Sequence, residues 1–240
     1  MYQIQYNKMK NQIEITSKTN IDNLSGYNDI FITWLPNESF INILNKVIEL
    51  KNKGFNPIPH IPVLKIKNKK ELKFISHILS KYTNTLLLIR GSGKQEGEFN
   101  TVESVIKTGI LNNFKIGVAG FPEGNGNLDY NQTLNILKQK SSYSDFVVTQ
   151  WSLNKKSIKR FLDESPLPVY LGIPNKCNLK QLLKFSKLCG IENSIKYYIN
   201  NSKINLLKLM INGFNPSDII NEFKNHKNLK GFHIYSFGKI

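Results

Sequence analysis

Short apolar runs recur along this chain, and most of them end in a polar or turn-forming residue. Leu86-Leu87-Leu88-Ile89 runs into Arg90-Gly91, and Phe146-Val147-Val148 runs into Thr149-Gln150. Runs of roughly four to eight residues bounded by turn signals are typical of buried strands. The pattern predicts eight strands, at residues 12–16, 29–34, 57–64, 85–90, 115–120, 146–150, 168–173 and 231–237.

Apolar residues at helical spacing lie between these strands. One stripe runs through residues 40–48 and another through residues 72–79, and each would cover the outside of a sheet. A helix is expected to start near Asn100, and Gly190 is expected to stop a later one. The long segment 191–228 is expected to hold two helices, broken at Gly213-Phe214-Asn215-Pro216.

Eight strands that alternate with helices predict a single-domain (β/α)8 barrel, or TIM barrel, over residues 1–240. Neither an internal repeat nor a linker divides the chain. In such a barrel the C-terminal ends of the strands meet at one face, where the active site lies. We therefore expect the polar strand ends, among them Glu14, His60 and Gln150, to share that face. The apolar strand that ends in Phe121-Pro122-Glu123 favours close approach by a ligand.

The net positive charge favours binding to the phosphates of nucleic acid, but the distribution of the basic residues does not. The chain has 33 basic and 17 acidic residues, a net charge of +16, and a basic surface attracts nucleic acid. The lysines are scattered among Asn and Ile, without a zinc-finger spacing, an aromatic ribonucleoprotein motif or a compact basic arm. We expect no dedicated nucleic-acid binding. Cys177 and Cys189 are too few for a zinc cluster and are expected to be ordinary thiols.

No apolar run approaches the roughly 20 residues needed to cross a bilayer. The N-terminus, Met1-Tyr2-Gln3-Ile4-Gln5, lacks a basic segment followed by a hydrophobic one. We therefore expect a soluble cytoplasmic protein without a membrane partner. A homo-oligomer stays open, because the sequence indicates no particular contact face.

The motifs at the strand ends stand in an order that resembles the methylenetetrahydrofolate reductase family. Each match is short, but together they extend from Gln12 to Gly238. The matching segments are Ile13-Glu14-Ile15, Pro59-His60, Ile89-Arg90-Gly91, Phe121-Pro122-Glu123, Leu137-Lys138-Gln139-Lys140, Val148-Thr149-Gln150, Gly172-Ile173-Pro174 and Phe232-His233-Ile234-Tyr235.

The resemblance implies an oxidoreductase that converts 5,10-methylenetetrahydrofolate to 5-methyltetrahydrofolate with NADH or NADPH through bound FAD. Arg is scarce in this chain, which favours NADH, since a 2′-phosphate calls for a nearby Arg. Glu14 matches the family's acid, which protonates the departing nitrogen. Apolar walls such as Ile13 and Ile15 would raise the pKa of such a carboxyl by desolvation. Without the resemblance, the residues favour a solvated charge at an edge of the first strand as the interpretation of Glu14.

The resemblance also assigns the other site residues. Those implied to hold FAD are Thr33, His60, Arg90, Gly91, Ser92, Phe121, Glu123, Asn125 and Lys140, and those implied to contact substrate are Gln150, Ile173 and Tyr235. The expected roles are a cation near the flavin pyrimidine side for the His60 and Arg90 positions and a phosphate contact for Lys140. Glu123 could bind a ribose hydroxyl or anchor its turn, and Tyr235 and His233 could equally be interior residues.

Three positions depart from the family pattern. Ser92 stands where the family has Asp, Phe121 where it has Tyr, and Asn125 where it has His. These departures keep two alternatives open. One is direct hydride transfer from the nicotinamide to folate without a flavin, and the other is a non-catalytic binding or methyl-transfer partner subunit.

Overall fold

The computed structural model describes residues 11–201 and 206–238, and its eight strands close into one parallel barrel. Each strand pairs with the next along the chain, and β1 pairs with β8 to complete the ring. The strands are β1 (Gln12–Thr16), β2 (Asp29–Thr33), β3 (Asn56–Pro62), β4 (Thr85–Ile89), β5 (Lys115–Gly120), β6 (Phe146–Thr149), β7 (Val169–Pro174) and β8 (Leu229–Tyr235). The predicted barrel is confirmed. The N-terminal segment Met1 to Gln5 lies outside the described residues.

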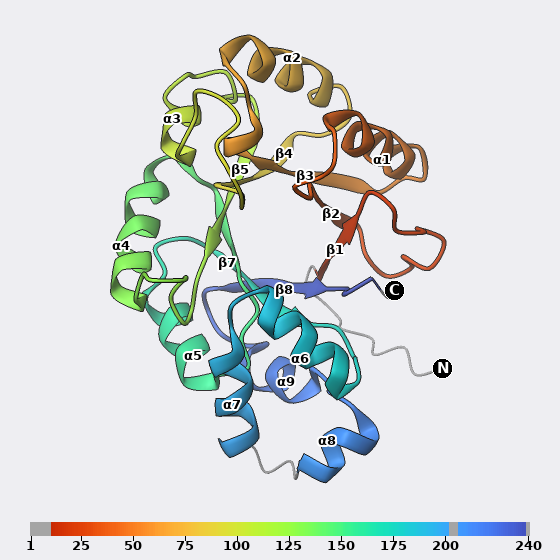
Figure 1. Ribbon diagram of the computed structural model, residues 1–240, viewed down its shortest axis with the longest axis vertical. Helices are drawn as coiled ribbons and strands as arrows, with labels where there is room; N and C mark the ends of the chain where they lie inside the picture. The colour runs from red at the N-terminus through yellow and green to blue at the C-terminus, as the bar shows by residue number, and fades with distance from the viewer. Residues whose placement is uncertain (1–10, 202–205, 239–240) are drawn as a thin grey trace.

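The helices surround the strands, as Figure 1 shows. They are α1 (Phe40–Asn52), α2 (Lys69–Leu79), α3 (Val102–Ile106), α4 (Tyr130–Lys140), α5 (Lys155–Glu164), α6 (Leu179–Leu188), α7 (Glu192–Asn201), α8 (Leu206–Asn212) and α9 (Ser217–Phe223), with 3-10 turns η1 (Val63–Lys65) and η2 (Ser141–Tyr143). None of those in the described part of the chain is long and apolar enough to cross a membrane.

Asparagines start several of these helices. The side chains of Asn68, Asn154 and Asn178 each accept a hydrogen bond from the backbone N–H three residues later, at the first turns of α2, α5 and α6. An Asn in this position satisfies an N–H that has no partner within the helix. The Asn-rich composition therefore contributes directly to where the helices begin.

One helical expectation needs a small correction. The helix expected to start near Asn100 has Thr101 as its N-cap and Val102 as its first residue, because Thr101 and Ser104 form a reciprocal capping box. The described part of segment 191–228 contains α7, α8 and α9. The expected break at Gly213 to Pro216 lies between α8 and α9. Gly190 ends α6 as expected, with a positive φ of 66°.

The barrel wall separates two apolar cores, because successive side chains on a strand point to opposite faces. Ile13 and Ile15 of β1 and Ile30 and Ile32 of β2 face outward and pack in the larger core beneath the helices. The barrel interior holds a second cluster, here called the interior plug, made of Phe31, Ile58, Leu87, Phe146 and Val148. Polar residues lie along the same strands on both sides of this plug, Glu14, Thr33 and His60 towards the C-terminal ends and Gln12, Asp29 and Asn56 towards the N-terminal ends.

Gly172 on β7 stands where a methyl group has no room. An added Cβ would lie 2.2 Å from the Thr149 carbonyl oxygen and 2.8 Å from the Tyr235 ring. We expect Gly172→Ala to lower the free energy of unfolding by about 1–3 kcal/mol, because the nearest neighbour is backbone and cannot rotate away. Urea denaturation measures this change. An unchanged midpoint and slope of the urea transition would show that β7 can move away from Thr149 and Tyr235 at little cost in free energy.

Candidate active site

Glu14 lies inside the barrel between a histidine of β8 and a histidine of β3. Its Oε2 atom is 3.2 Å from His233 Nε2 and 3.6 Å from His60 Nε2. The Glu14 side chain keeps 19% of its surface exposed, against 6% for His60 and 0% for His233. The carboxylate is therefore the most accessible member of this group, which we call the Glu14 cluster: Glu14, His60 and His233.

Barrel closure brings the Glu14 cluster together. β1 pairs directly with β8, with Gln12 opposite His233 and Glu14 opposite Tyr235. Glu14 and His233 are 219 positions apart in sequence. In a (β/α)8 barrel, side chains at the C-terminal ends of strands are the usual place for catalytic groups, and the cluster lies on that side of the interior plug.

The pKa of Glu14 is lowered, whereas the sequence led us to expect a raised one. Burial alone would raise it, but the hydrogen bond from His233 and attraction to the two imidazoles more than offset burial. Thr33 adds the smallest contribution. The expected apolar walls are absent because Ile13 and Ile15 point outward, into the core beneath the helices. Glu14 is consequently ionised at neutral pH in the protein alone.

Burial lowers the pKa of His60 to about 4, an effect that Glu14 opposes and His233 adds to. His60 is therefore neutral at neutral pH and cannot be the cation that the resemblance implied. Its Nε2 atom is buried and makes no hydrogen bond within the described residues, since 3.6 Å to Glu14 is too long. Thr33 Oγ1 is likewise buried, and although Thr33 helps to lower the pKa of Glu14, this atom makes no hydrogen bond of ordinary geometry within the described residues. His60 Nε2 and Thr33 Oγ1 are therefore polar atoms beside the Glu14 carboxylate that a bound ligand could contact.

The lowered pKa of His60 predicts acid sensitivity. Its ordinary value is 6.5, so the unfolded chain binds more protons than the folded one as the pH falls from 6.5 to about 4. Stability is full above this window and is lost on acidification through it. We expect a loss of about 1–3 kcal/mol in the free energy of unfolding, measured by denaturation at a series of pH values. His60→Asn should flatten this dependence, and an equal slope in both proteins would contradict the burial of a neutral imidazole.

Aromatic rings enclose the Glu14 cluster. Phe31 of the interior plug packs edge-on against His233, with ring centroids 4.7 Å apart. Tyr235 lies on the other side of His233 at 5.1 Å, and its hydroxyl donates to the Thr149 carbonyl at 3.0 Å. Tyr235 is half-buried and tied to the barrel wall. Its contact with a substrate stays a prediction.

The other two substrate residues have different positions. Gln150 follows β6, and its Oε1 accepts the backbone N–H of Trp151 at 3.0 Å, which fixes the amide near the C-terminal strand ends. Ile173 is fully buried in the core between the strands and helices. A side chain on that face cannot reach the barrel interior, so the expected substrate contact of Ile173 is wrong, at least for its side chain.

The segment after β4 reaches the same end of the barrel. Arg90 and Ser92 have exposed side chains, and Gly91 has a positive φ of 85°. A Cβ on Gly91 would also lie 2.8 Å from Pro62 Cβ, so glycine is needed both for the turn and for the close approach to β3. The exposed side chain of Arg90 therefore supplies a cation at this rim.

The residues assigned to the FAD nucleotide are dispersed. Glu123 accepts a hydrogen bond from the Ser152 hydroxyl, which is neither of the two roles considered for it. Phe121 is half-buried, and Asn125 is exposed in a tight turn. Lys140 is the last residue of α4, a helix that returns the chain to the N-terminal end of β6. The structure therefore does not bring Lys140 to the Glu14 cluster.

His233 is the functional candidate that the sequence reading left open. Its strand alternates, with Phe232 and Ile234 buried in the core beneath the helices and His233 inside the barrel. That alternation was visible in the sequence, but its partner Glu14 was not. Neither Cys177 nor Cys189 forms a disulfide within the described residues, and no group of three metal-binding side chains occurs among them.

The fold has counterparts among solved structures, whereas no family model matches the chain. An oxaloacetate acetylhydrolase is 9% identical with a TM-score of 0.56, over 96% of this chain and 76% of that one. A protein assigned as a phosphonomutase from Burkholderia cenocepacia J2315 is 8% identical with a TM-score of 0.54, over 95% and 86%. The chain folds as a TIM barrel.

A third similar structure is the oxygenating constituent of 3,6-diketocamphane monooxygenase from the CAM plasmid of Pseudomonas putida, in complex with FMN. It is 10% identical with a TM-score of 0.52, over 88% of this chain and 82% of that one. These three proteins are enzymes by name. At such identities the likeness shows the fold alone.

Proposed function

We propose that the protein is an enzyme of the methylenetetrahydrofolate reductase type, which reduces 5,10-methylenetetrahydrofolate with NADH or NADPH. The observation that carries the proposal is the Glu14 carboxylate, held by His233 and placed beside His60 at the C-terminal end of the barrel. This is the place at which the family resemblance expects an acid, and barrel enzymes build their sites at this end.

Reduction requires one proton besides the hydride. Opening of the five-membered ring breaks a carbon–nitrogen bond, the departing nitrogen takes a proton, and the carbon accepts the hydride. Glu14 would hold that proton. Because its carboxylate is ionised in the protein alone, it must be protonated first, and a bound ligand that excludes water from the barrel mouth would raise its pKa. His233 would act as a positioning residue that fixes the carboxylate through the 3.2 Å contact.

The residues present match only part of an FAD molecule. Thr33, His60, Arg90 and Gly91 lie at the C-terminal end of the barrel and could contact a flavin ring, which supplies two-electron transfer when bound. The phosphate contacts do not gather there, because Lys140 lies at the far end of α4 and Glu123 is bonded to Ser152. We therefore propose contacts to the flavin ring of FAD and none to its phosphates. A similar barrel, the oxygenating constituent of 3,6-diketocamphane monooxygenase, is in complex with FMN, so the fold can accommodate a flavin.

A second candidate function follows from that dispersal. Direct hydride transfer from the nicotinamide to folate needs no flavin phosphates, and it keeps the same role for Glu14. The position of Lys140 favours this candidate over tight FAD binding.

An absorbance spectrum separates these candidates. Purified protein that is incubated with excess FAD, freed of unbound ligand, and still holds a flavin that NADH bleaches and methylenetetrahydrofolate re-oxidises would establish the flavin route. A colourless protein that still oxidises NADH with methylenetetrahydrofolate would establish direct transfer. A colourless protein without turnover would reject both enzymatic proposals.

A further inference from the structure

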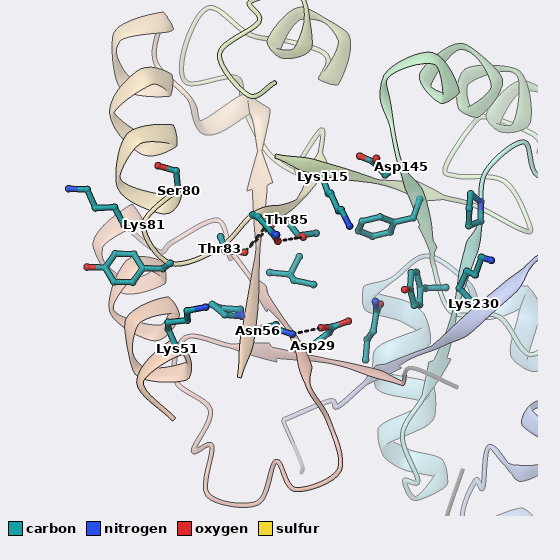
Figure 2. Close-up of a pocket in the computed structure, with 18 residues that line it drawn as sticks. Asp29, Lys51, Asn56, Ser80, Lys81, Thr83, Thr85, Lys115, Asp145 and Lys230 are labelled. Atoms are coloured by element: carbon teal, nitrogen blue, oxygen red, sulfur yellow. Dashed lines mark hydrogen bonds between the residues drawn. The ribbon is translucent and has the colours of Figure 1, made fainter. Parts of the chain in front are cut away.

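A cavity of about 650 Å³ opens at the end of the barrel opposite to the Glu14 cluster. Figure 2 shows its lining, which comes from the N-terminal ends of the strands and the turns that lead into them. Gln12, Asp29, Asn56 and Thr85 are each the first residue of a strand. The volume is that of an ordinary small-molecule site, although this end of a TIM barrel usually serves stability.

The interior plug isolates this cavity from the Glu14 cluster. Ile58 and Phe146 belong both to the plug and to the cavity lining. Phe146 packs edge-on against Tyr170, which also lines the cavity, with ring centroids 5.5 Å apart. The floor of the cavity is therefore apolar and aromatic, and a flat ring system can lie against it.

The rim of the cavity is positively charged. Lys51, Lys81, Lys115 and Lys230 line it and form no ion pair within the described residues, against two carboxylates, Asp29 and Asp145. Those carboxylates already accept hydrogen bonds, Asp29 from the Asn56 amide and Asp145 from the Ile116 backbone N–H. Lys115 projects from β5 towards the middle of the opening in Figure 2. An anion would meet uncommitted ammonium groups here.

Gln12 supplies the second, independent observation. It is 2% exposed, lines the cavity, and its Oε1 atom has no hydrogen-bond partner among the described residues. A buried acceptor without a partner is rare, because it loses the hydrogen bond that water gave it. A bound molecule with a hydrogen-bond donor would satisfy Gln12 Oε1. A negative charge on the same molecule would be attracted to the lysines of the rim.

We propose that this cavity binds a nucleoside monophosphate, with the base against Phe146 and Tyr170, a base N–H donating to Gln12 Oε1, and the phosphate at Lys115 and its neighbouring lysines. One molecule of this class meets the three requirements of a flat ring, a donor and a negative charge. The site does not involve Glu14 and is independent of the proposed reductase function.

Isothermal titration of the full chain with AMP at physiological salt tests the site. We expect one molecule to bind per chain, and adenosine and inorganic phosphate, which each carry half of the recognition, to bind about tenfold more weakly or worse. Absence of binding at millimolar AMP would overturn the proposal. Binding of inorganic phosphate as tight as that of AMP would also overturn it, since the aromatic floor would then contribute nothing.

Variants locate the binding. Lys115→Ala and Gln12→Leu should each weaken AMP binding about tenfold, and Lys115 is exposed, so its variant should fold even if the Gln12 variant does not. Lys73→Ala, an exposed lysine of α2 outside the cavity, should leave the affinity unchanged, as should Glu14→Gln. Equal weakening by Lys73→Ala and Lys115→Ala would show general attraction by the net charge of +16 and would refute the site.

Discussion

Replacement of Glu14 by Gln is expected to lower the rate of methylenetetrahydrofolate reduction by about 10²–10⁴-fold, the usual contribution of a positioned acid or base. Gln has nearly the same shape as Glu and can still bond His233, but it has no proton to give to the departing nitrogen. Oxidation of NADH by an artificial electron acceptor should be retained if a flavin is bound, because that half-reaction needs no proton at this position. Steady-state assays of the two half-reactions measure the difference.

Glu103→Gln is a suitable control for this experiment. Glu103 pairs with Lys107 on the exposed surface of α3, 2.7 Å apart, and the change should leave both half-reactions intact. Equal losses of both half-reactions in Glu14→Gln would assign Glu14 a structural role and would remove the main support for the proposed function.

Replacement of Phe31 by Ala is expected to lower the free energy of unfolding by about 3–5 kcal/mol. The ring is fully buried in the interior plug and packs against both His233 and His60, at 4.7 Å and 6.0 Å. Strands on every side of the barrel hold their positions, so the cavity left behind cannot close by collapse. Guanidinium denaturation followed by circular dichroism measures the loss.

Phe74→Ala provides the matched comparison. Phe74 lies on α2 with 56% of its surface exposed and touches one ring, Phe40. The same chemical deletion there should cost well under 1 kcal/mol. Similar losses for the two variants would mean that the interior plug is not tightly packed. Phe31→Ala should also weaken catalysis where it remains folded, because His233 loses the ring that holds its plane.

The barrel could be predicted because its signals are local. Apolar runs such as Leu86 to Ile89 and helical stripes such as residues 40–48 each report on their own neighbourhood. Boundaries were less exact where local signals compete. The run after Pro57 continues through Val63 and Leu64, but these residues turn into η1 beyond Pro62, and proline in a strand gives no hint of where pairing stops.

The candidate site was only partly predictable, because it depends on pairing between distant strands. Glu14 and His60 were expected at one face, and the structure brings the Glu14 carboxylate within 3.6 Å of His60 Nε2, although Glu14 is the middle residue of β1. The direction of the pKa shift of Glu14 was wrong because it is governed by His233, which only the β1–β8 pairing brings near. The placement of Ile173 was wrong for a reason already present in the sequence, since its neighbours Gly172 and Pro174 point inward and an alternating strand directs Ile173 outward.

The pairing of β1 with β8 also bears on how the chain is made. β1 contains residues 12–16 and β8 residues 229–235, so during synthesis one edge of β1 lacks its partner until more than 200 further residues have been translated. An open strand edge invites pairing with other chains. The nascent protein therefore passes through a long aggregation-prone stage, and its yield in cells should depend on chaperones that shield β1 until β8 emerges.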